Sequence, residues 1–279
     1  MTRSTRSIKL STGVALPYQE QGDPSGVPMV LLHGYSDSSR SFELLLPHLP
    51  PYIHAYVLTQ RGHCDADKPP SGYRPEDYAA DVGAFLDAMG HPKAMIVGHS
   101  GGSYTAQRFA VDNPDRTLGV VLIGSFHAFR DNPGVGELED TVAQLTDPVD
   151  QEFVREFQES CVSQPVPERF MEAIIDASCR VPARVWKAYL EELVAADVPT
   201  ETGTIASPTL ILWGDQDLFC GRSDQEALLA AIPRARLSTY RGTGHCPHWE
   251  QPERAAAEIA ALTAGAAEGA SLDELASTI

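Results

Sequence analysis

Residues 97–102, VGHSGG, place one serine among glycines at the junction of two predicted elements. The apolar run Ala94–Val97 precedes the serine, and the helical pattern Ser103–Val111 follows it. A sharp strand-to-helix turn holds its central residue in strained backbone geometry, so the chain closes only where the flanking residues are small. Such a turn exposes the serine Oγ beside the N–H groups and the positive dipole end of the helix. A glycine-rich turn with a passive serine is the alternative, but the flanking elements favour a nucleophilic Ser100.

A general base and a carboxylate must accompany this serine, because a serine alone is a weak nucleophile. The candidate base is His245, in a glycine-bounded loop after a predicted strand, and His248 in the same loop is its rival. The candidate carboxylates are Asp215 and Asp217, directly after the apolar run Thr209–Trp213. Serine, aspartate and histidine thus follow one another in one of the chain orders known for catalytic triads.

Backbone donors for a negatively charged oxygen are expected at two turns. A tetrahedral intermediate needs N–H groups aimed at its oxyanion. One donor is the N–H of Gly101, directly after the serine. The other is the N–H of Tyr35, in the stretch LLHGY (residues 31–35) that ends an apolar run. We expect His33 to order this loop by hydrogen bonding and not to react.

Short apolar runs alternate with helical patterns along the chain, which is typical of a mostly parallel sheet with crossover helices. The runs lack polar alternation, as strands buried on both faces should. The predicted strands are Pro28–Leu32, Ala55–Leu58, Ala94–Val97, Leu118–Ile123, Thr209–Trp213 and Arg236–Tyr240. The predicted helices are Ser38–Leu46, Glu76–Met89, Ser103–Val111, Ser223–Ala231 and Pro252–Leu262.

The stretch from about Ala128 to Thr204 breaks this alternation, because it has helical patterns and no convincing strand. A helical insertion between two strands is one interpretation, and a separate domain is the other. We favour the insertion, since the buried-strand pattern resumes at Thr209. The chain then divides into a core, residues 1–127 and 205–279, and an insertion, residues 128–204. The tail from Ala264 is rich in Ala and Gly, so we expect it to be frayed or loosely helical.

The composition is that of an ordinary globular protein. Of its 279 residues, 43% are hydrophobic and 21% are charged, which excludes disordered and collagen-like chains. There are 21 Lys and Arg against 38 Asp and Glu, a net charge of -17. A field of this sign repels phosphate backbones and anionic lipid surfaces. We therefore expect a small-molecule substrate and neither a nucleic-acid nor a membrane partner, while a homodimer stays open.

The cysteines and the first residues bear on the cellular compartment. The five cysteines are scattered and contain no C-x-x-C pair, which indicates neither a disulfide framework nor a structural zinc site. Residues 1–9 carry basic side chains with no apolar segment behind them. No run approaches the roughly 18 apolar residues of a membrane helix. A cytoplasmic protein is the expectation.

Together these stretches resemble the α/β-hydrolase superfamily, in its esterase-like group with a helical cap. The segments HG-x, G-x-S-x-G, G-D-x-D and G-H-x-x-x-x-E-x-P occur in the expected order between about Val27 and Glu258. The resemblance implies an α/β-hydrolase fold, with a mostly parallel central sheet flanked by helices. It implies Ser100 as nucleophile, Asp217 as acid and His245 as base, and it makes residues 128–204 a cap over the site.

The sequence departs from the family pattern at two positions. The segment RGHCDA, residues 61–66, has Cys64 where the family often carries glycine. A non-glycine residue there would store about 1–3 kcal/mol of strain if its φ were positive. Gly101 stands where many relatives carry methionine, which leaves more room beside the serine. Ser100 itself excludes the members with an aspartate nucleophile, the epoxide hydrolases and dehalogenases.

The expected activity is hydrolysis of carboxylic esters or lactones by a serine hydrolase without a cofactor. Small, neutral, rather apolar substrates fit the acidic surface and the aromatic cap. Cap packing explains most of the aromatic residues, and Phe126 and Trp186 are the expected substrate-binding ones. The sequence has no Walker loop, no G-x-G-x-x-G after the first strand, and no His/Cys cluster at metal-ligand spacing. No cofactor and no metal are therefore expected.

Two alternatives stay open. A carbon–carbon bond hydrolase of vinylogous diketones uses the same triad, so the motifs do not separate it from an esterase. A ligand receptor of the same fold would keep the triad and turn over slowly. A panel of substrates and a multiple-turnover measurement distinguish these functions.

Overall fold

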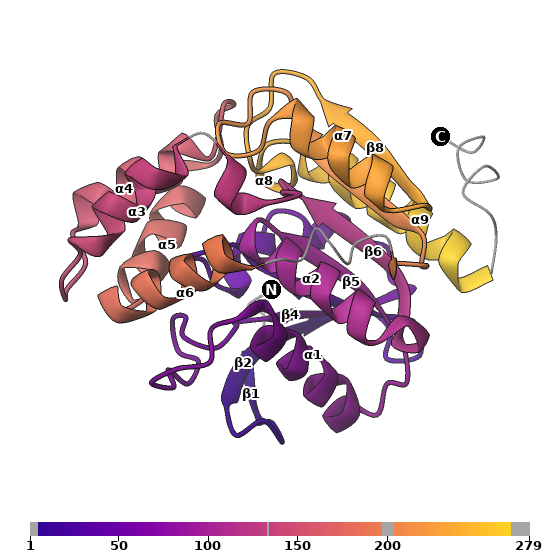
Figure 1. Cartoon of the computed structure of the whole chain (residues 1–279). Helices are drawn as coiled ribbons and strands as arrows, with labels where there is room; N and C mark the ends of the chain where they lie inside the picture. Colours follow the sequence, from indigo (N-terminus) through magenta and orange to yellow (C-terminus); the bar gives the residue numbers. More distant parts are fainter. Residues whose placement is uncertain (1–4, 133, 197–203, 269–279) are drawn as a thin grey trace.

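The centre of the molecule is an eight-stranded sheet, whose strands lie side by side in the order β1-β2-β4-β3-β5-β6-β7-β8. It belongs to a computed structural model that describes residues 5–132, 134–196 and 204–268 (Figure 1). Strands β4, β3, β5, β6, β7 and β8 pair in parallel, whereas β1 and β2 form an antiparallel edge. The strands are β1 Arg6–Lys9, β2 Ala15–Gln21, β3 Val27–Leu32, β4 Ile53–Leu58, β5 Ala94–His99, β6 Thr117–Ile123, β7 Thr209–Gly214 and β8 Ala235–Tyr240. This mostly parallel sheet confirms the predicted fold class.

Apolar side chains fill the space on both faces of the sheet, because successive residues of a strand point to opposite sides. In β3, Leu32 joins one cluster, and Leu31 joins another. The first cluster includes residues of α1 (Pro75–Met89), α2 (Gly101–Asp112) and α7 (Arg222–Ala231). The second includes residues of α9 (Pro252–Glu268) and of two short 3-10 helices. Layers of helix, sheet and helix therefore hold the strand ends rigidly.

Helices α3 to α6 lie between β6 and β7 in the chain and form what we call the cap. Figure 1 shows them gathered to one side of the sheet, apart from α7 and α9. Their buried residues form a further cluster that also takes in core side chains such as Tyr35 and Trp249. Their bounds are α3 Val135–Ala143, α4 Gln151–Ser160, α5 Glu168–Cys179 and α6 Ala183–Ala195. The division at residues 128 and 204 stays a prediction.

The prediction of a helix at Ser38–Leu46 is wrong. The chain there forms two short 3-10 helices, Ser39–Phe42 and Leu46–His48. Ser38 Oγ accepts a hydrogen bond from the N–H of Arg40 (3.3 Å), and such local bonds from serine side chains compete with a regular helix. The other four predicted helices correspond to α1, α2, α7 and α9.

Both antiparallel edge strands, β1 and β2, escaped prediction because their sequences mix polar and apolar residues and lie partly exposed. At the other end of the chain, α9 continues past Ala264 to Glu268. The rest of the predicted tail lies outside the described residues. Within the described ranges, no helix combines the length and the hydropathy that a membrane span requires.

Candidate active site

Ser100 lies between β5 and α2 and has a positive φ, with φ 51° and ψ -122°. Its N–H donates to the carbonyl of Ile123 at the end of β6 (2.9 Å). The neighbouring glycines are required, since a Cβ on Gly98 would lie 2.2 Å from the carbonyl oxygen of Gly102. A Cβ on Gly102 would lie 2.4 Å from the carbonyl oxygen of His33. The turn therefore has the strained geometry of a nucleophile elbow, which costs about 1–3 kcal/mol.

His245 and Asp217 form a buried pair, with 2.9 Å between His245 Nδ1 and Asp217 Oδ2. Asp217 lies three residues after the end of β7, and its Oδ1 accepts the N–H groups of Phe219 (2.8 Å) and Cys220 (3.0 Å). These bonds fix the carboxylate in the turn. Because a carboxylate only accepts hydrogen bonds, the imidazole proton belongs on Nδ1, and Nε2 is left as a base.

The two rival residues lie elsewhere. Asp215 accepts a hydrogen bond from the N–H of Gly242 at its Oδ1 (2.7 Å) and supports the loop that carries His245. His248 is fully buried, and its Nε2 lies 3.3 Å from Ser41 Oγ. Burial lowers the pKa of His248 well below its usual value. The structure thus pairs His245 with Asp217, and neither Asp215 nor His248 belongs to this pair.

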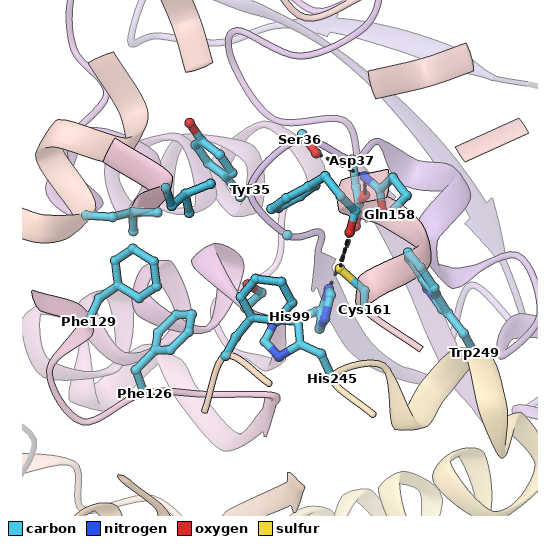
Figure 2. A pocket seen from close by; sticks show the side chains of 16 residues that line it. Tyr35, Ser36, Asp37, His99, Phe126, Phe129, Gln158, Cys161, His245 and Trp249 are labelled. Carbon is cyan, nitrogen blue, oxygen red and sulfur yellow. Dashed lines mark hydrogen bonds and ion pairs between the residues drawn. The ribbon is translucent and has the colours of Figure 1, made fainter. Parts of the chain in front are cut away.

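A cavity of about 30 Å³ lies between the core and the cap, and Ser100 and His245 both line it. It has room for about two or three water molecules. Figure 2 shows Phe126 and Phe129 on one side and Ser36, Asp37 and Gln158 on the other. The lining residues are Gly34, Tyr35, Ser36, Asp37, His99, Ser100, Phe126, Phe129, Leu138, Phe157, Gln158, Cys161, Leu193, Phe219, His245 and Trp249.

Residues 33–37, which we call the oxyanion loop because Tyr35 is one of the predicted oxyanion donors, are held by buried histidines. His33 Nδ1 lies 2.9 Å from the carbonyl oxygen of Gly34, and His33 Nε2 accepts the N–H of Gln60 (3.0 Å). Burial lowers the pKa of His33 to about 3, so the ring is neutral and Nδ1 donates. That bond fixes the peptide plane that carries the N–H of Tyr35. His63 Nε2 lies 2.7 Å from the carbonyl oxygen of Tyr35 and fixes the next peptide.

Gly101 is the first residue of α2, directly after Ser100. The expectation of extra room at this glycine is wrong, because the cap fills the space. A Cβ on Gly101 would lie 2.6 Å from the hydroxyl oxygen of Tyr189, which belongs to α6. The glycine thus allows the cap to approach the start of α2 closely.

The two aromatic residues expected to bind substrate have different positions. Phe126 lines the cavity, with its ring centroid 6.2 Å from that of His245. Trp186 is buried in α6 outside the cavity lining. Its ring stands edge-on to Tyr35 at 5.0 Å, and its carbonyl accepts a hydrogen bond from the Tyr35 hydroxyl.

Asp37 is a buried carboxylate in the cavity wall that sequence reasoning missed. Its oxygens accept hydrogen bonds from Ser41 Oγ and from Gln158 Nε2 (both 3.1 Å), and His99 Nδ1 lies 3.8 Å away. Burial pushes the pKa of Asp37 upward, but His99, His33 and the hydrogen bond from Gln158 together outweigh burial and leave the pKa below its usual value. Its place soon after LLHGY was a signal, yet no sequence pattern shows that a loop carboxylate is buried.

In the described part of the chain, three side chains of types that bind metals lie close enough together to be tested as a metal site. They are Asp217, Cys220 and His245, and their potential ligand atoms lie within 4.8 Å of one another. Asp217 and His245 already bond to each other at 2.9 Å. Burial raises the pKa of the Cys220 thiol well above its usual value, which opposes the thiolate that a metal requires. This is the geometry of a hydrogen-bonded pair with a thiol beside it.

Comparison with known families gives one decisive match, since the model of the alpha/beta hydrolase family covers residues 29–258. The chain belongs to the alpha/beta hydrolase family. An esterase from Exiguobacterium antarcticum has the same fold, with a TM-score of 0.83 over 94% of this chain and all of that one (100%), at 20% identity.

Two curated relatives of this alpha/beta hydrolase carry substrate names. The 2-(acetamidomethylene)succinate hydrolase of Mesorhizobium japonicum is 34% identical over 110 residues, which is 39% of this chain and 39% of that protein. The 2-hydroxy-6-oxo-6-phenylhexa-2,4-dienoate hydrolase of Burkholderia cepacia is 28% identical over 194 residues, 63% of this chain and 64% of that protein. The chain thus spans less than two thirds of the length of either relative.

Proposed function

We propose that this alpha/beta hydrolase is a serine hydrolase that cleaves small, neutral carboxylic esters or lactones. One observation carries the proposal: Ser100, on a strained turn, lines the same apolar cavity as His245, which Asp217 orients at 2.9 Å. A nucleophile, a base and an orienting carboxylate in this arrangement are the parts that acyl transfer requires.

In the mechanism, Ser100 Oγ attacks the substrate carbonyl while His245 Nε2 takes its proton. Asp217 holds the imidazole and stabilises its charged form. The N–H groups of Tyr35 and Gly101 bind the developing oxyanion. His245 then returns the proton to the leaving alcohol, and a water molecule cleaves the acyl-enzyme with His245 again as base.

Cavity size and charge support a small and neutral substrate. Its volume of about 30 Å³ favours a short acyl group such as acetyl. Among the described residues that line it, none is Lys or Arg, and Asp37 contributes a buried negative charge. A substrate carboxylate would meet no cation there and would be repelled by Asp37 and by the protein's net charge of -17. Phe126 is the proposed apolar contact for the acyl group.

Carbon–carbon bond hydrolysis is the second candidate, and the name of the Burkholderia relative favours it. The names of both curated relatives contain a carboxylate, a dienoate in one and a succinate in the other. A site for such anions needs a cationic partner for the carboxylate. The described cavity wall offers Asp37 in place of a cation, so we rank ester hydrolysis first.

A stopped-flow experiment with p-nitrophenyl acetate and butyrate tests the proposal, with Ser100→Ala as the control. We expect a burst of p-nitrophenol followed by steady turnover, faster for acetate, and neither phase in the variant. A burst that then stalls would favour the slow receptor. Neither burst nor turnover in folded protein would count against ester hydrolysis, and 2-hydroxy-6-oxo-dienoates would be the next substrates.

A further inference from the structure

One stretch of the cap, residues 158–164, touches both catalytic loops, and we call it the bridging segment. It runs from the end of α4 into the α4–α5 connection. One of its ends contacts the oxyanion loop, and the other contacts residues 242–246, the histidine loop. The bridging segment therefore links the oxyanion loop to the loop of the general base through one continuous piece of the cap. It does so beside the contacts that Tyr35 and Gly101 make with α6.

On the oxyanion side, one buried amide makes the contact. Gln158 is 1% exposed. Its Nε2 lies 3.0 Å from Ser36 Oγ and 3.1 Å from Asp37 Oδ1, both in the oxyanion loop, and 2.9 Å from Ser178 Oγ in α5. Hydrogen bonds are directional, and an unsatisfied amide in the interior is costly. The position of α4 and the position of Ser36 and Asp37 are therefore mutually fixed.

On the histidine side, backbone groups and one carboxylate make the contact. The N–H of His245 donates to the carbonyl of Cys161 (2.9 Å). Glu250 accepts the N–H groups of Ser163 (3.0 Å) and Gln164 (2.6 Å) at one oxygen and that of Gly244 (2.8 Å) at the other. The backbone of the catalytic histidine is thus bonded directly to the cap.

We propose that the bridging segment sets the oxyanion loop in register with His245 and that Gln158 is a positioning residue for catalysis. This inference rests on the proposed ester hydrolysis. The strand ends alone place Ser100 and Asp217, whereas Tyr35 lies in a loop, and this loop is bonded to both the sheet and the cap. The position of the cap therefore governs how well the N–H of Tyr35 is aligned to donate a hydrogen bond to the oxyanion. It does not only control how the substrate enters.

Gln158→Met tests the inference, because methionine has similar volume and makes no amide hydrogen bonds. Ser178→Ala is the matched control, since it removes a bond that the same amide makes within the cap. Each variant is assayed with an ester and with the corresponding thionoester. The sulfur of a thionoester accepts hydrogen bonds weakly, so its hydrolysis depends less on oxyanion donors.

We expect Gln158→Met to lower kcat for the ester by about 10- to 100-fold, less than the roughly 10²–10³-fold that follows removal of an oxyanion donor. KM should change less than about threefold, and the thionoester rate should fall less than the ester rate. Ser178→Ala should stay within about threefold of the wild type for both substrates.

Equal losses for ester and thionoester, or a change in KM alone, would show that Gln158 acts through cavity shape and would overturn the inference. Equal effects of Gln158→Met and Ser178→Ala would overturn it as well. If Gln158→Met does not fold, Ser36→Ala removes one of the two loop acceptors of Gln158, leaves Asp37 in place and carries the same comparison. A wild type that turns over no ester would refute the proposed function itself, and this inference with it.

Discussion

The parallel strands and the cap contribute to the site in different ways. Strands β4, β5 and β7 bury every residue, and their backbones pair with neighbouring strands. The cap holds its place through aromatic packing and through hydrogen bonds of side chains and backbone, such as those of Gln158 and that between the N–H of His245 and the carbonyl of Cys161. Ser100 and Asp217 of the proposed triad follow the ends of β5 and β7, and the cap closes the cavity around them. If the proposed function holds, the chemistry depends on backbone geometry in the core, and substrate choice and fine positioning depend on side chains of both the core and the cap.

The largest effect should come from the core. Ser100→Ala removes the nucleophile and should lower ester turnover by about 10⁴-fold or more. The thermal midpoint should not fall, since the side chain makes no contact that holds the fold. Steady-state kinetics beside a thermal melt give both values. Substantial retained activity would remove Ser100 from the nucleophile role.

The acid should show nearly as large an effect. Asp217→Asn should cost about 10³–10⁴-fold in kcat, because an amide favours the wrong imidazole tautomer. Asp215→Asn is the matched control two residues away and should cost less than about threefold. The two pH–rate profiles, measured side by side, check this expectation. The reverse ranking would move the acid to Asp215.

A change in the cavity wall should alter substrate selection and leave the chemistry in place. Phe129→Ala enlarges the cavity and should raise the preference for butyrate over acetate by about tenfold in kcat/KM. Phe153→Ala is the control, because this aromatic packs on Trp186 at 5.6 Å and lies outside the cavity lining. An unchanged ratio in Phe129→Ala would place the acyl group elsewhere.

The smallest expected effect is a pH dependence of stability that arises in the core and not in the cap. Residues 128–204 contain no histidine, whereas the core buries His33 and His248. Burial lowers the pKa of His33 to about 3 and that of His248 well below its usual value. The unfolded chain takes up protons below about pH 6.5 and the folded core does not, so stability is full above that pH and falls below it.

Each such histidine should lower the free energy of unfolding by up to about 1.4 kcal/mol for each pH unit below pH 6.5. Urea denaturation at pH 7.5 and pH 5.5 measures the loss. It is followed by activity and by tryptophan fluorescence, which reports on both parts because Trp186 lies in the cap and Trp213 and Trp249 lie in the core. Constant stability across this range would mean that these rings are protonated in the folded protein.

The strand ends and the triad segments could be predicted because buried parallel strands leave unbroken apolar runs. Ala94–Val97 and Thr209–Trp213 are such runs, and their ends placed Ser100 and Asp217. The antiparallel strand β2 could not be found in the same way, since it is only partly buried and its sequence mixes polar and apolar residues.

The cap contacts could not be predicted, because they depend on which face of each helix turns inward. In the sequence, Trp186 and Phe126 are both aromatic residues without a pattern that assigns them to the cavity. In the structure, Phe126 lines the cavity and Trp186 does not. Gln158 and Asp37 are polar residues of a kind that normally faces water. Only tertiary packing shows that they are buried and bonded to each other at 3.1 Å.

Two residues other than glycine have positive φ in the described chain, Ser100 at 51° and Cys64 at 45°. The strain at Ser100 accompanies its proposed role as nucleophile, so natural selection would retain it. Cys64 lies outside the lining of the catalytic cavity and faces Arg180. Its strain of about 1–3 kcal/mol exceeds the roughly 0.5–1 kcal/mol entropic cost of a glycine. Position 64 is thus where an engineer could raise heat tolerance with Cys64→Gly while leaving turnover intact.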